Sequence, residues 1–253
     1  MKKMYFVLFL ALGVSVIPIS SWAFEFGVRG HYWAASLDGS VKVDEGDIIG
    51  EKIDFEQDLG IGDERLPALE VFIGGGNHHL SLIYTDVEYS GSNVITRDIV
   101  FSGETYSFGS LTTSSIEYQT MDLSYQYDLI NAENMLAGFS LGAVFQVKYF
   151  NGEVRLQTTG IDEKENFTLP VPMIGLNFHM GILADLLEAR VRGTGVSYSG
   201  NHIYELLGEL SLTPLPFVEI HGGYRTFTID IDEDEVTFDY VMSGPYIALT
   251  IGF

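Results

Sequence analysis

The sequence ends in YIALTIGF, residues 246–253, in which a large apolar side chain stands at every second position. The apolar positions are Ile247, Leu249, Ile251 and Phe253. Successive side chains of a β-strand point to opposite faces, so this period of two predicts a strand with one apolar face. The chain carries a formal charge of −22, and a free apolar edge would invite aggregation, so the strand is expected to be paired on both sides.

The same alternation recurs along the rest of the chain. It is clearest in residues 24–33, 135–149, 174–182 and 203–212. A soluble β-sandwich also alternates, but its strands are usually about five or six residues long. Several segments here exceed ten residues, which suits strands that cross a bilayer at a tilt.

The predicted fold class is all-β: a closed antiparallel transmembrane up-and-down β-barrel. Counting segments from turn to turn gives ten strands, with eight as the alternative. The predicted strands lie near residues 24–36, 65–74, 78–90, 114–129, 135–156, 167–183, 187–199, 203–213, 217–229 and 236–253. The strand number is expected to be even, because both chain ends should lie on the periplasmic side.

Connections of alternating length support this topology. Short periplasmic turns are expected at residues 75–77, 131–134, 184–186 and 213–216. Longer, acidic extracellular loops are expected at residues 37–64, 91–113, 157–166 and 230–235, with a brief one at 200–202. The apolar positions change phase at Ser243–Pro245 and between Tyr224 and Phe227, which predicts a β-bulge at each place.

Residues 1–23 have the pattern of a secretory signal peptide. Lys2 and Lys3 precede an apolar run of about 15 residues, and the segment ends on Ala23, where cleavage is predicted. A membrane anchor is the alternative, but the run is shorter than the roughly 20 residues that a spanning helix needs. Residues 24–253 would then form one barrel domain of 253 − 23 = 230 residues with charge −22 − 2 = −24, located in the outer membrane.

Composition excludes several functions. Cysteine is absent, so there is no disulfide, thiolate metal site or cysteine nucleophile. The acidic balance and the lack of a basic stripe argue against nucleic acid as a partner. GGGN at 74–77 has no following Lys and precedes a strand, so it is not a phosphate-binding loop.

The terminal stretch IALTIGF resembles the C-terminal signature of bacterial outer-membrane β-barrels. This resemblance implies that Phe253 is an assembly signal and that the barrel-assembly machinery is a partner. The stretch IDFEQDLGIGDERLPALEVFIGGGNHHLSLIYTDVEYSG, residues 53–91, is similar to the first loop and second hairpin of small Gram-negative barrel proteins of the OmpA-like and OmpW-like size class. Together the two stretches cover under a fifth of the chain, and they imply a fold without an activity.

The polar side of each alternating strand would line the lumen. The expected lumen charge network consists of Glu25, Arg29, His31, Glu70, Asp122, Lys148, Glu188, Arg190, Arg192, Glu205, Glu209, Glu219 and Arg225. Side chains can largely fill a barrel of eight or ten strands. An ion pair of Arg190 or Arg192 with Glu205 or Glu209 on the neighbouring strand would close the pore. A narrow channel for a small solute is the alternative.

Acidic residues are concentrated in the predicted extracellular loops. Residues 37–64 carry ten of them against only Lys42 and Lys52: Asp38, Asp44, Glu45, Asp47, Glu51, Asp54, Glu56, Asp58, Asp63 and Glu64. DIDEDE at 230–235 begins like a calcium loop but lacks its glycine and terminal carboxylate, so no metal ligand or cofactor is assigned. The favoured interpretation is a solvated charge cap. The expected partners are outer-membrane lipids and lipopolysaccharide, with divalent cations at the acidic loops.

No catalytic residue is assigned. Of the six histidines, His78 and His79 would lie at a periplasmic turn and His179 and His221 inside the wall. Only His31 and His202 would approach the outer rim. Ser197 and Ser199 lie near His202, but no nucleophile-elbow motif surrounds them. The chain is therefore expected to be a non-enzymatic outer-membrane barrel with a structural or surface-interaction role. A rim enzyme that hydrolyses lipid or peptide is the second alternative, after the channel.

Overall fold

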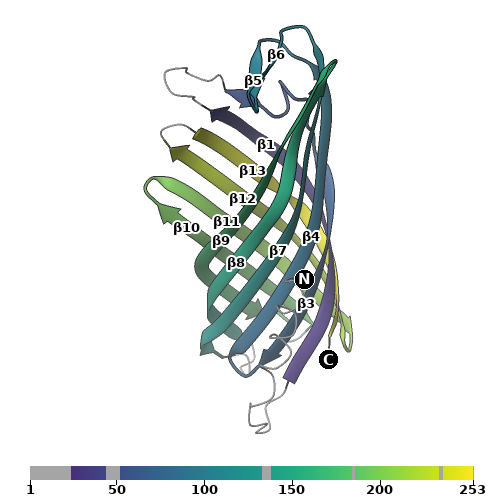
Figure 1. Cartoon of the computed structure of the whole chain (residues 1–253). Coiled ribbons are helices and arrows are strands. Elements are labelled where there is room, and N and C mark those ends of the chain that lie inside the picture. Colours follow the sequence, from purple (N-terminus) through teal and green to yellow (C-terminus); the bar gives the residue numbers. More distant parts are fainter. Residues whose placement is uncertain (1–23, 44–51, 133–137, 184–185, 234–235, 253) are drawn as a thin grey trace, which may run out of the picture.

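The computed structural model describes residues 24–43, 52–132, 138–183, 186–233 and 236–252. Ten long strands make up a barrel (Figure 1): β1 (Phe24–Val43), β3 (Glu64–Gly75), β4 (His78–Val94), β7 (Leu111–Asn131), β8 (Phe139–Thr158), β9 (Ile161–Gly181), β10 (Leu187–Tyr198), β11 (Asn201–Leu215), β12 (Val218–Glu233) and β13 (Val236–Gly252). Three short strands lie in the connections: β2 (Ile53–Asp54), β5 (Ile99–Phe101) and β6 (Glu104–Tyr106). Phe253 and the predicted signal peptide, residues 1–23, lie outside the described residues.

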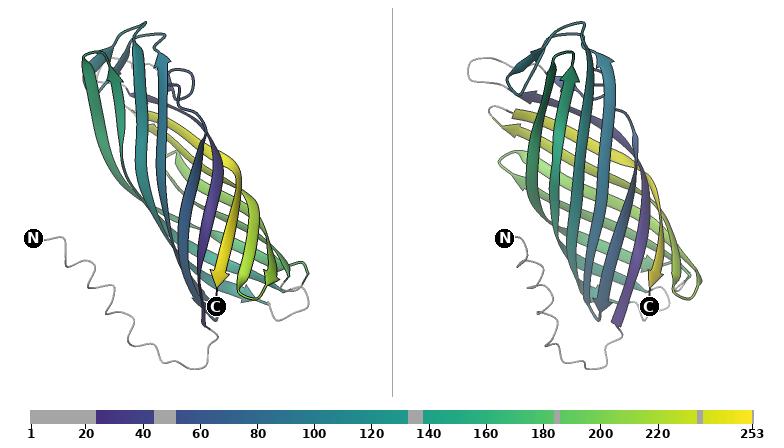
Figure 2. Two further views of the ribbon diagram at one scale, coloured as in Figure 1. Left: turned by 90° about the vertical axis from the view of Figure 1, so that its right-hand side faces the viewer. Right: turned by 45° about the vertical axis from the view of Figure 1, so that its right-hand side comes forward.

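The barrel is closed by its first and last strands. Each long strand pairs antiparallel with its neighbour, and β13 pairs with β1 from Gly252 opposite Gly27 to Val236 opposite Val43. Both views in Figure 2 show β13, in yellow, beside β1, in purple. The predicted ten-stranded up-and-down barrel is therefore confirmed. Closure gives the edge of the terminal strand a partner, as a strand surrounded by lipid requires.

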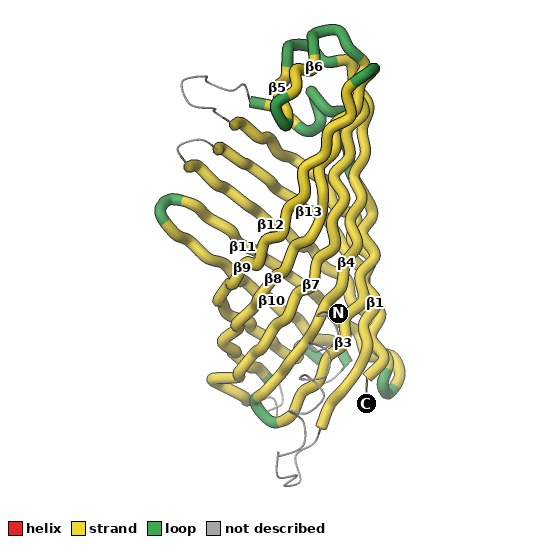
Figure 3. The backbone as a smooth tube through the Cα atoms, in the orientation of Figure 1, coloured by secondary structure: helices red, strands yellow, loops and turns green. Residues whose placement is uncertain are grey.

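Among the described residues, no helix is long and apolar enough to cross a membrane. Strands and loops account for the whole described chain in Figure 3.

An apolar belt surrounds the lower part of the barrel. Its outward side chains include Leu69, Leu82, Phe145, Leu206 and Leu249, all at least about two-fifths exposed. Five outward tyrosines stand where the outward residues change from apolar to polar: Tyr32, Tyr84, Tyr149, Tyr204 and Tyr224. Rings of aromatic residues at the membrane interface are typical of outer-membrane barrels.

The two predicted bulges in β12 and β13 are wrong. Pairing between these strands is continuous from Val236 to Ile251, and the even-numbered residues of β13 from Phe238 to Thr250 face inward. The apolar side changes because the surroundings change. Within the belt, lipid lies outside and the interior is polar, so Leu249 points outward and Thr250 inward. Above the belt, water lies outside and the interior is packed, so Tyr240 is buried.

β12 shows the same inversion. Ile220 and Tyr224 face outward in the belt, whereas Phe227 and Ile229, above it, are buried inside. The register shifts that do occur lie elsewhere, between Asp128 and Ile130 on β7 and between Leu212 and Leu215 on β11.

The strands continue well above the belt, so several predicted loops are hairpins. Residues 157–166 were expected to be a loop, but β8 and β9 extend to Thr158 and Ile161 and are joined by a turn in which Gly160 has φ +88°. Arg155 and Asp162 form an ion pair of 2.5 Å beside this turn, and the bonded guanidinium lowers the pKa of Asp162. The predicted periplasmic turn at 213–216 is also displaced, because β11 runs to Leu215.

An apolar core fills the barrel above the belt. Phe150, Phe227 and Tyr240 come from the wall, and Phe55, Leu59, Ile61, Ile95, Ile99 and Tyr106 come from the connections. Tyr106 donates a hydrogen bond of 2.8 Å to the Leu156 carbonyl, and burial raises its pKa.

The acidic connection after β1 therefore folds partly inward and is not only a solvated cap. Asp58 is buried and pairs with Arg97 at 2.5 Å, and the Asp54 carboxylate accepts the Gln57 amide at 2.8 Å. Asp44, Glu45, Asp47, Glu51, Asp234 and Glu235 lie outside the described residues.

The wall is uneven in height. β4, β7 and β8 rise above the ends of β10 and β11 (Figure 1). β9 pairs with β10 only between Ile174 and Gly181, although it pairs with β8 along its whole length above this point. The upper part of β9, residues 161–173, is therefore a sheet edge.

Candidate functional site: the lumen

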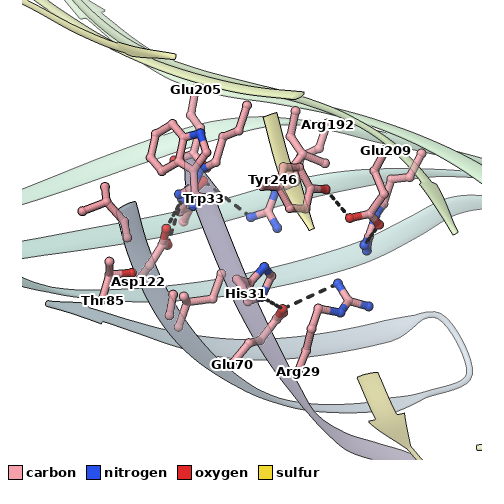
Figure 4. A pocket seen from close by; sticks show the side chains of 17 residues that line it. Arg29, His31, Trp33, Glu70, Thr85, Asp122, Arg192, Glu205, Glu209 and Tyr246 are labelled. Carbon is pink, nitrogen blue, oxygen red and sulfur yellow. Dashed lines mark hydrogen bonds and ion pairs between the residues drawn. The ribbon is translucent and has the colours of Figure 1, made fainter. Parts of the chain in front are cut away.

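Strand alternation brings the predicted charge network into the lumen. Twelve of the thirteen predicted residues line two neighbouring cavities, and Lys148 is buried beside them. The first cavity, of about 60 Å³, lies at mid-barrel and is shown in Figure 4. The second, of about 210 Å³, extends to residues next to the short turns, such as Glu25, His79 and Glu188. Both are lined by Arg29, Glu70, Arg190, Arg192 and Glu209.

The upper cluster lies just beneath the apolar core. The Lys148 ammonium is 2.5 Å from an Asp122 oxygen and 3.0 Å from a Glu205 oxygen. Arg225 pairs with Glu205 at 2.8 Å and lies over the Trp33 ring, 4.8 Å from its centroid. The two cations and two carboxylates come from four different strands, so the cluster ties opposite parts of the wall together.

The middle cluster is centred on Glu209 of β11. Its carboxylate pairs with Arg190 of β10, accepts a hydrogen bond from Tyr246 of β13 and lies 3.3 Å from the Nδ1 of His221 on β12. Arg190 and Glu209 are direct cross-strand neighbours. This is one of the ion pairs expected from the sequence. Arg192 does not form the other, because it donates to Ser124 and Gln146.

A third cluster connects β1 and β3. The Glu70 carboxylate is 2.9 Å from the His31 Nε2 and 3.5 Å from an Arg29 nitrogen (Figure 4). The prediction that His31 approaches the outer rim is wrong. β1 continues to Val43, twelve residues beyond His31, so this histidine lies within the wall and points into the lumen.

Histidine–carboxylate pairs surround the lower cavity. The pairs are His79 with Asp128 at 2.8 Å, His179 with Glu188 at 3.1 Å and His221 with Glu219 at 3.3 Å. Sequence reasoning missed Asp128 and the inward position of His79. Gln126 and Asp128, one alternation apart and followed by a turn, were the available signal. His78, by contrast, is an outward residue and bonds to the Tyr125 hydroxyl at 2.7 Å.

His202 is the other histidine that was predicted to approach the outer rim. This residue is exposed on the outward side of β11, opposite Ser197. Among the hydrogen bonds of the described residues, none joins it to Ser197, Ser199 or a carboxylate. No group of three or more His, Asp or Glu side chains in the described part of the chain is arranged to hold a metal ion.

Comparisons with known proteins agree on the fold. The sequence matches no protein-family model and no curated protein. The structure is similar to the outer membrane protease OmpT from Escherichia coli, with a TM-score of 0.51 and 8% identity over 93% of this chain and 99% of that chain. Neisserial surface protein A matches with a TM-score of 0.36 and 12% identity over 90% and 97% of the two chains.

Ail, the attachment invasion locus protein of Yersinia pestis, matches with a TM-score of 0.35 and 15% identity over 89% and 98%. OmpT is an outer-membrane protein, and the chain shares its β-barrel fold. At 8% identity, the likeness to a protease extends to the fold alone.

Proposed function

We propose that this chain is a non-enzymatic integral protein of the outer membrane, with a closed lumen and a structural or surface-interaction role. One observation carries the proposal: a paired charge network lies directly beneath an apolar core inside the same barrel. Asp122, Lys148 and Glu205 form the top of the network, and Phe227 packs above Lys148, with the ammonium 5.3 Å from the ring centroid.

Each layer opposes ion passage for a different reason. An ion that crossed the apolar core would lose its hydration without finding polar partners, which is costly. In the network, removal of one partner of a buried ion pair leaves the other uncompensated, so the pairs resist opening. The apolar core and the charge network together are the physical basis for a lumen that is closed to ions.

The extracellular tip supports a surface-interaction role. Val94 and Leu111 are cross-strand partners that both face outward, and Leu111 is 63% exposed. Phe108 in the adjoining connection is 72% exposed. Exposed apolar groups at one place on a protein surface are characteristic of interaction sites.

The proposed partners in the membrane follow from the outer wall. Outer-membrane lipids would contact the apolar belt, and lipopolysaccharide would surround the outward residues near the five outward tyrosines at its upper border. Asp86 and Glu88 lie just above Tyr84, so divalent cations would bridge these carboxylates to anionic lipid groups. The barrel-assembly machinery would receive the terminal strand.

Planar-bilayer recording tests the closed lumen. We expect the wild-type chain to give no conductance steps, and the double variant Phe150→Ala/Phe227→Ala, which thins the core, to give steps. The stacked rings of these residues lie 5.9 Å apart. Wild-type steps that change with substitution of Arg190 or Glu209 would contradict closure. They would favour the narrow channel, for which the two lumen cavities are the supporting observation.

Two further assays address the remaining parts of the proposal. A band on unboiled gels that shifts on boiling, found in isolated outer membranes, would support the location. Lipid or peptide hydrolysis by the wild type that is lost in His31→Ala or His202→Ala would contradict the non-enzymatic assignment. Turnover absent from the wild type and from both variants would support it.

A further inference from the structure

Arg192 differs from the other strongly basic residues of the lumen. Arg29, Lys148, Arg190 and Arg225 each have a carboxylate oxygen within 4.0 Å. Among the described residues, Arg192 has none at that distance. Its guanidinium donates to the Ser124 hydroxyl at 2.6 Å and to the Gln146 side-chain carbonyl at 3.4 Å, both of them neutral. Asp122 and Glu205 act on Arg192 only from beyond contact distance, so its guanidinium is a largely desolvated cation at which a directly bound anion is electrostatically favoured.

Asn177 provides a second, independent observation. It is the direct cross-strand neighbour of Arg192 and is only 4% exposed. Its side-chain oxygen is buried and has no hydrogen-bond partner among the described residues. The amide oxygen and nitrogen of Asn exchange places when the group is turned over, so Asn177 can present its NH₂ group to an acceptor instead. An unpartnered amide beside an unpaired guanidinium lacks the anionic acceptor that would satisfy both.

The cavity provides space and access for such a group. Arg192 lines both lumen cavities, and Asn177 lines the lower one, of about 210 Å³, together with Ser124. Since about 10–15 Å³ of such volume holds one water, the lower cavity accommodates a small hydrated anion. It reaches the end of the barrel with the short turns, which in outer-membrane barrels faces the periplasm.

We propose that Arg192, Asn177 and Ser124 form a binding site for a small oxyanion, a phosphate or carboxylate group, that enters from the periplasm. The guanidinium provides charge and directed donors, and the amide and hydroxyl supply two more donors at a deeply buried position. The inference goes beyond the proposed function. A conducting and a non-conducting barrel could both carry the site, so bilayer recording does not decide it.

Trp33 provides a built-in probe. It is the only tryptophan after residue 23, it is buried, and it lines the mid-barrel cavity with Arg192 (Figure 4). The full chain without its predicted signal peptide would be refolded in detergent free of phospholipid, so that all phosphate comes from the added salt. Inorganic phosphate would be titrated against chloride at constant ionic strength. Trp33 emission and the thermal unfolding midpoint would be followed.

We expect a saturable change in emission and a rise in the midpoint with phosphate but not with chloride. Arg192→Gln should raise the half-saturation concentration about tenfold or more, because it removes a charge-assisted bond. Arg155→Gln removes an exposed arginine above the belt and should titrate like the wild type. Equal responses to phosphate and chloride, meaning an effect of ionic strength only, would overturn the site.

Asn177→Asp keeps the test decisive if Arg192→Gln does not refold. This nearly isosteric change places a carboxylate beside Arg192, which supplies the missing counter-ion from within the chain. We expect Asn177→Asp to have a higher midpoint than the wild type without phosphate, and to lose the response to phosphate. If Asn177→Asp responds to phosphate in the same way as the wild type, the proposal is overturned.

Discussion

Arg190 on β10 and Glu209 on β11 are direct cross-strand neighbours in the barrel wall, and their side chains form an ion pair inside the lumen. Tyr246 donates to the same carboxylate from β13, and His221 approaches it from β12. Glu209 therefore links β11 to β10, β12 and β13, and the link to β13, which is not a neighbour of β11 in the sheet, is made by side chains alone. A substitution of Glu209 should therefore change the stability of the folded barrel.

We expect Glu209→Gln to destabilise the folded barrel by about 3–5 kcal/mol, because it leaves the Arg190 charge without its partner. Urea titration of the refolded chain, followed by the gel mobility of unboiled samples, measures the change. The double variant Arg190→Met/Glu209→Leu removes both charges and should recover most of the lost stability. A double variant less stable than Glu209→Gln would contradict this explanation.

The outward face of the wall is apolar in the belt and polar above it. Two outward positions of β13 should therefore differ in how well they accept a charged residue. Leu249 and Val241 both point outward on β13, but Leu249 lies in the apolar belt and Val241 above it. Leu249→Arg should cost about 2–4 kcal/mol, the range for a cation facing mid-membrane lipid, and Val241→Arg about 0–1 kcal/mol. Unfolding in lipid vesicles measures both, and equal losses would place Val241 within the membrane.

This inversion also explains what could be predicted from the sequence. Period two is a property of the backbone, so residues such as Phe145 and Leu206 revealed ten strands and the interior face of each one within the membrane. The pattern does not state which solvent lies on which side. The change from Phe227 to Tyr224 was therefore interpreted as a bulge, although the backbone is regular and only the surroundings change.

Other features lay beyond sequence reasoning for related reasons. The hairpin that carries Arg155 and Asp162 has polar residues on its outer face and short side chains at the turn, so it produced no apolar alternation. The bond from Arg192 to Ser124 joins β10 to β7, and two strands, β9 and β8, lie between them in the wall. Contacts across a lumen depend on the barrel diameter and on side-chain reach, which the order of residues does not provide.

A row of like charges crosses the outer wall above the belt. Glu88, Glu117 and Glu153 are direct cross-strand neighbours on β4, β7 and β8. Within the described part of the chain, Glu153 alone of the three has a lysine partner, Lys164 at 3.2 Å. Like charges directly opposite each other destabilise a sheet, so Glu117→Gln should stabilise the barrel by about 0.2–1 kcal/mol. The measurement is urea unfolding at low and high salt.

Screening provides the control for this prediction. At an ionic strength of about 1 M the Debye length falls to about 3 Å, so the advantage of Glu117→Gln should shrink. Magnesium should also stabilise the wild type more than the variant, if divalent cations are partners of this row. A loss of stability in Glu117→Gln at low salt would show that repulsion between these carboxylates is not significant.

The free upper edge of β9 makes a final prediction about assembly. Residues 161–173 pair with β8 but not with β10, so their outer side is a sheet edge that another strand could join. Pro170 and Pro172 lie in this edge, and proline has no amide hydrogen to offer an added strand. We expect Pro170→Thr/Pro172→Thr, which restores two donors, to form dimers or larger species.

Size-exclusion chromatography in detergent at increasing protein concentration measures the association of this double variant. Thr168→Val leaves the backbone donors unchanged and should remain like the wild type. If the double proline variant elutes at the wild-type position at every concentration, the prolines do not protect this edge, and the charged residues of 161–166 are sufficient.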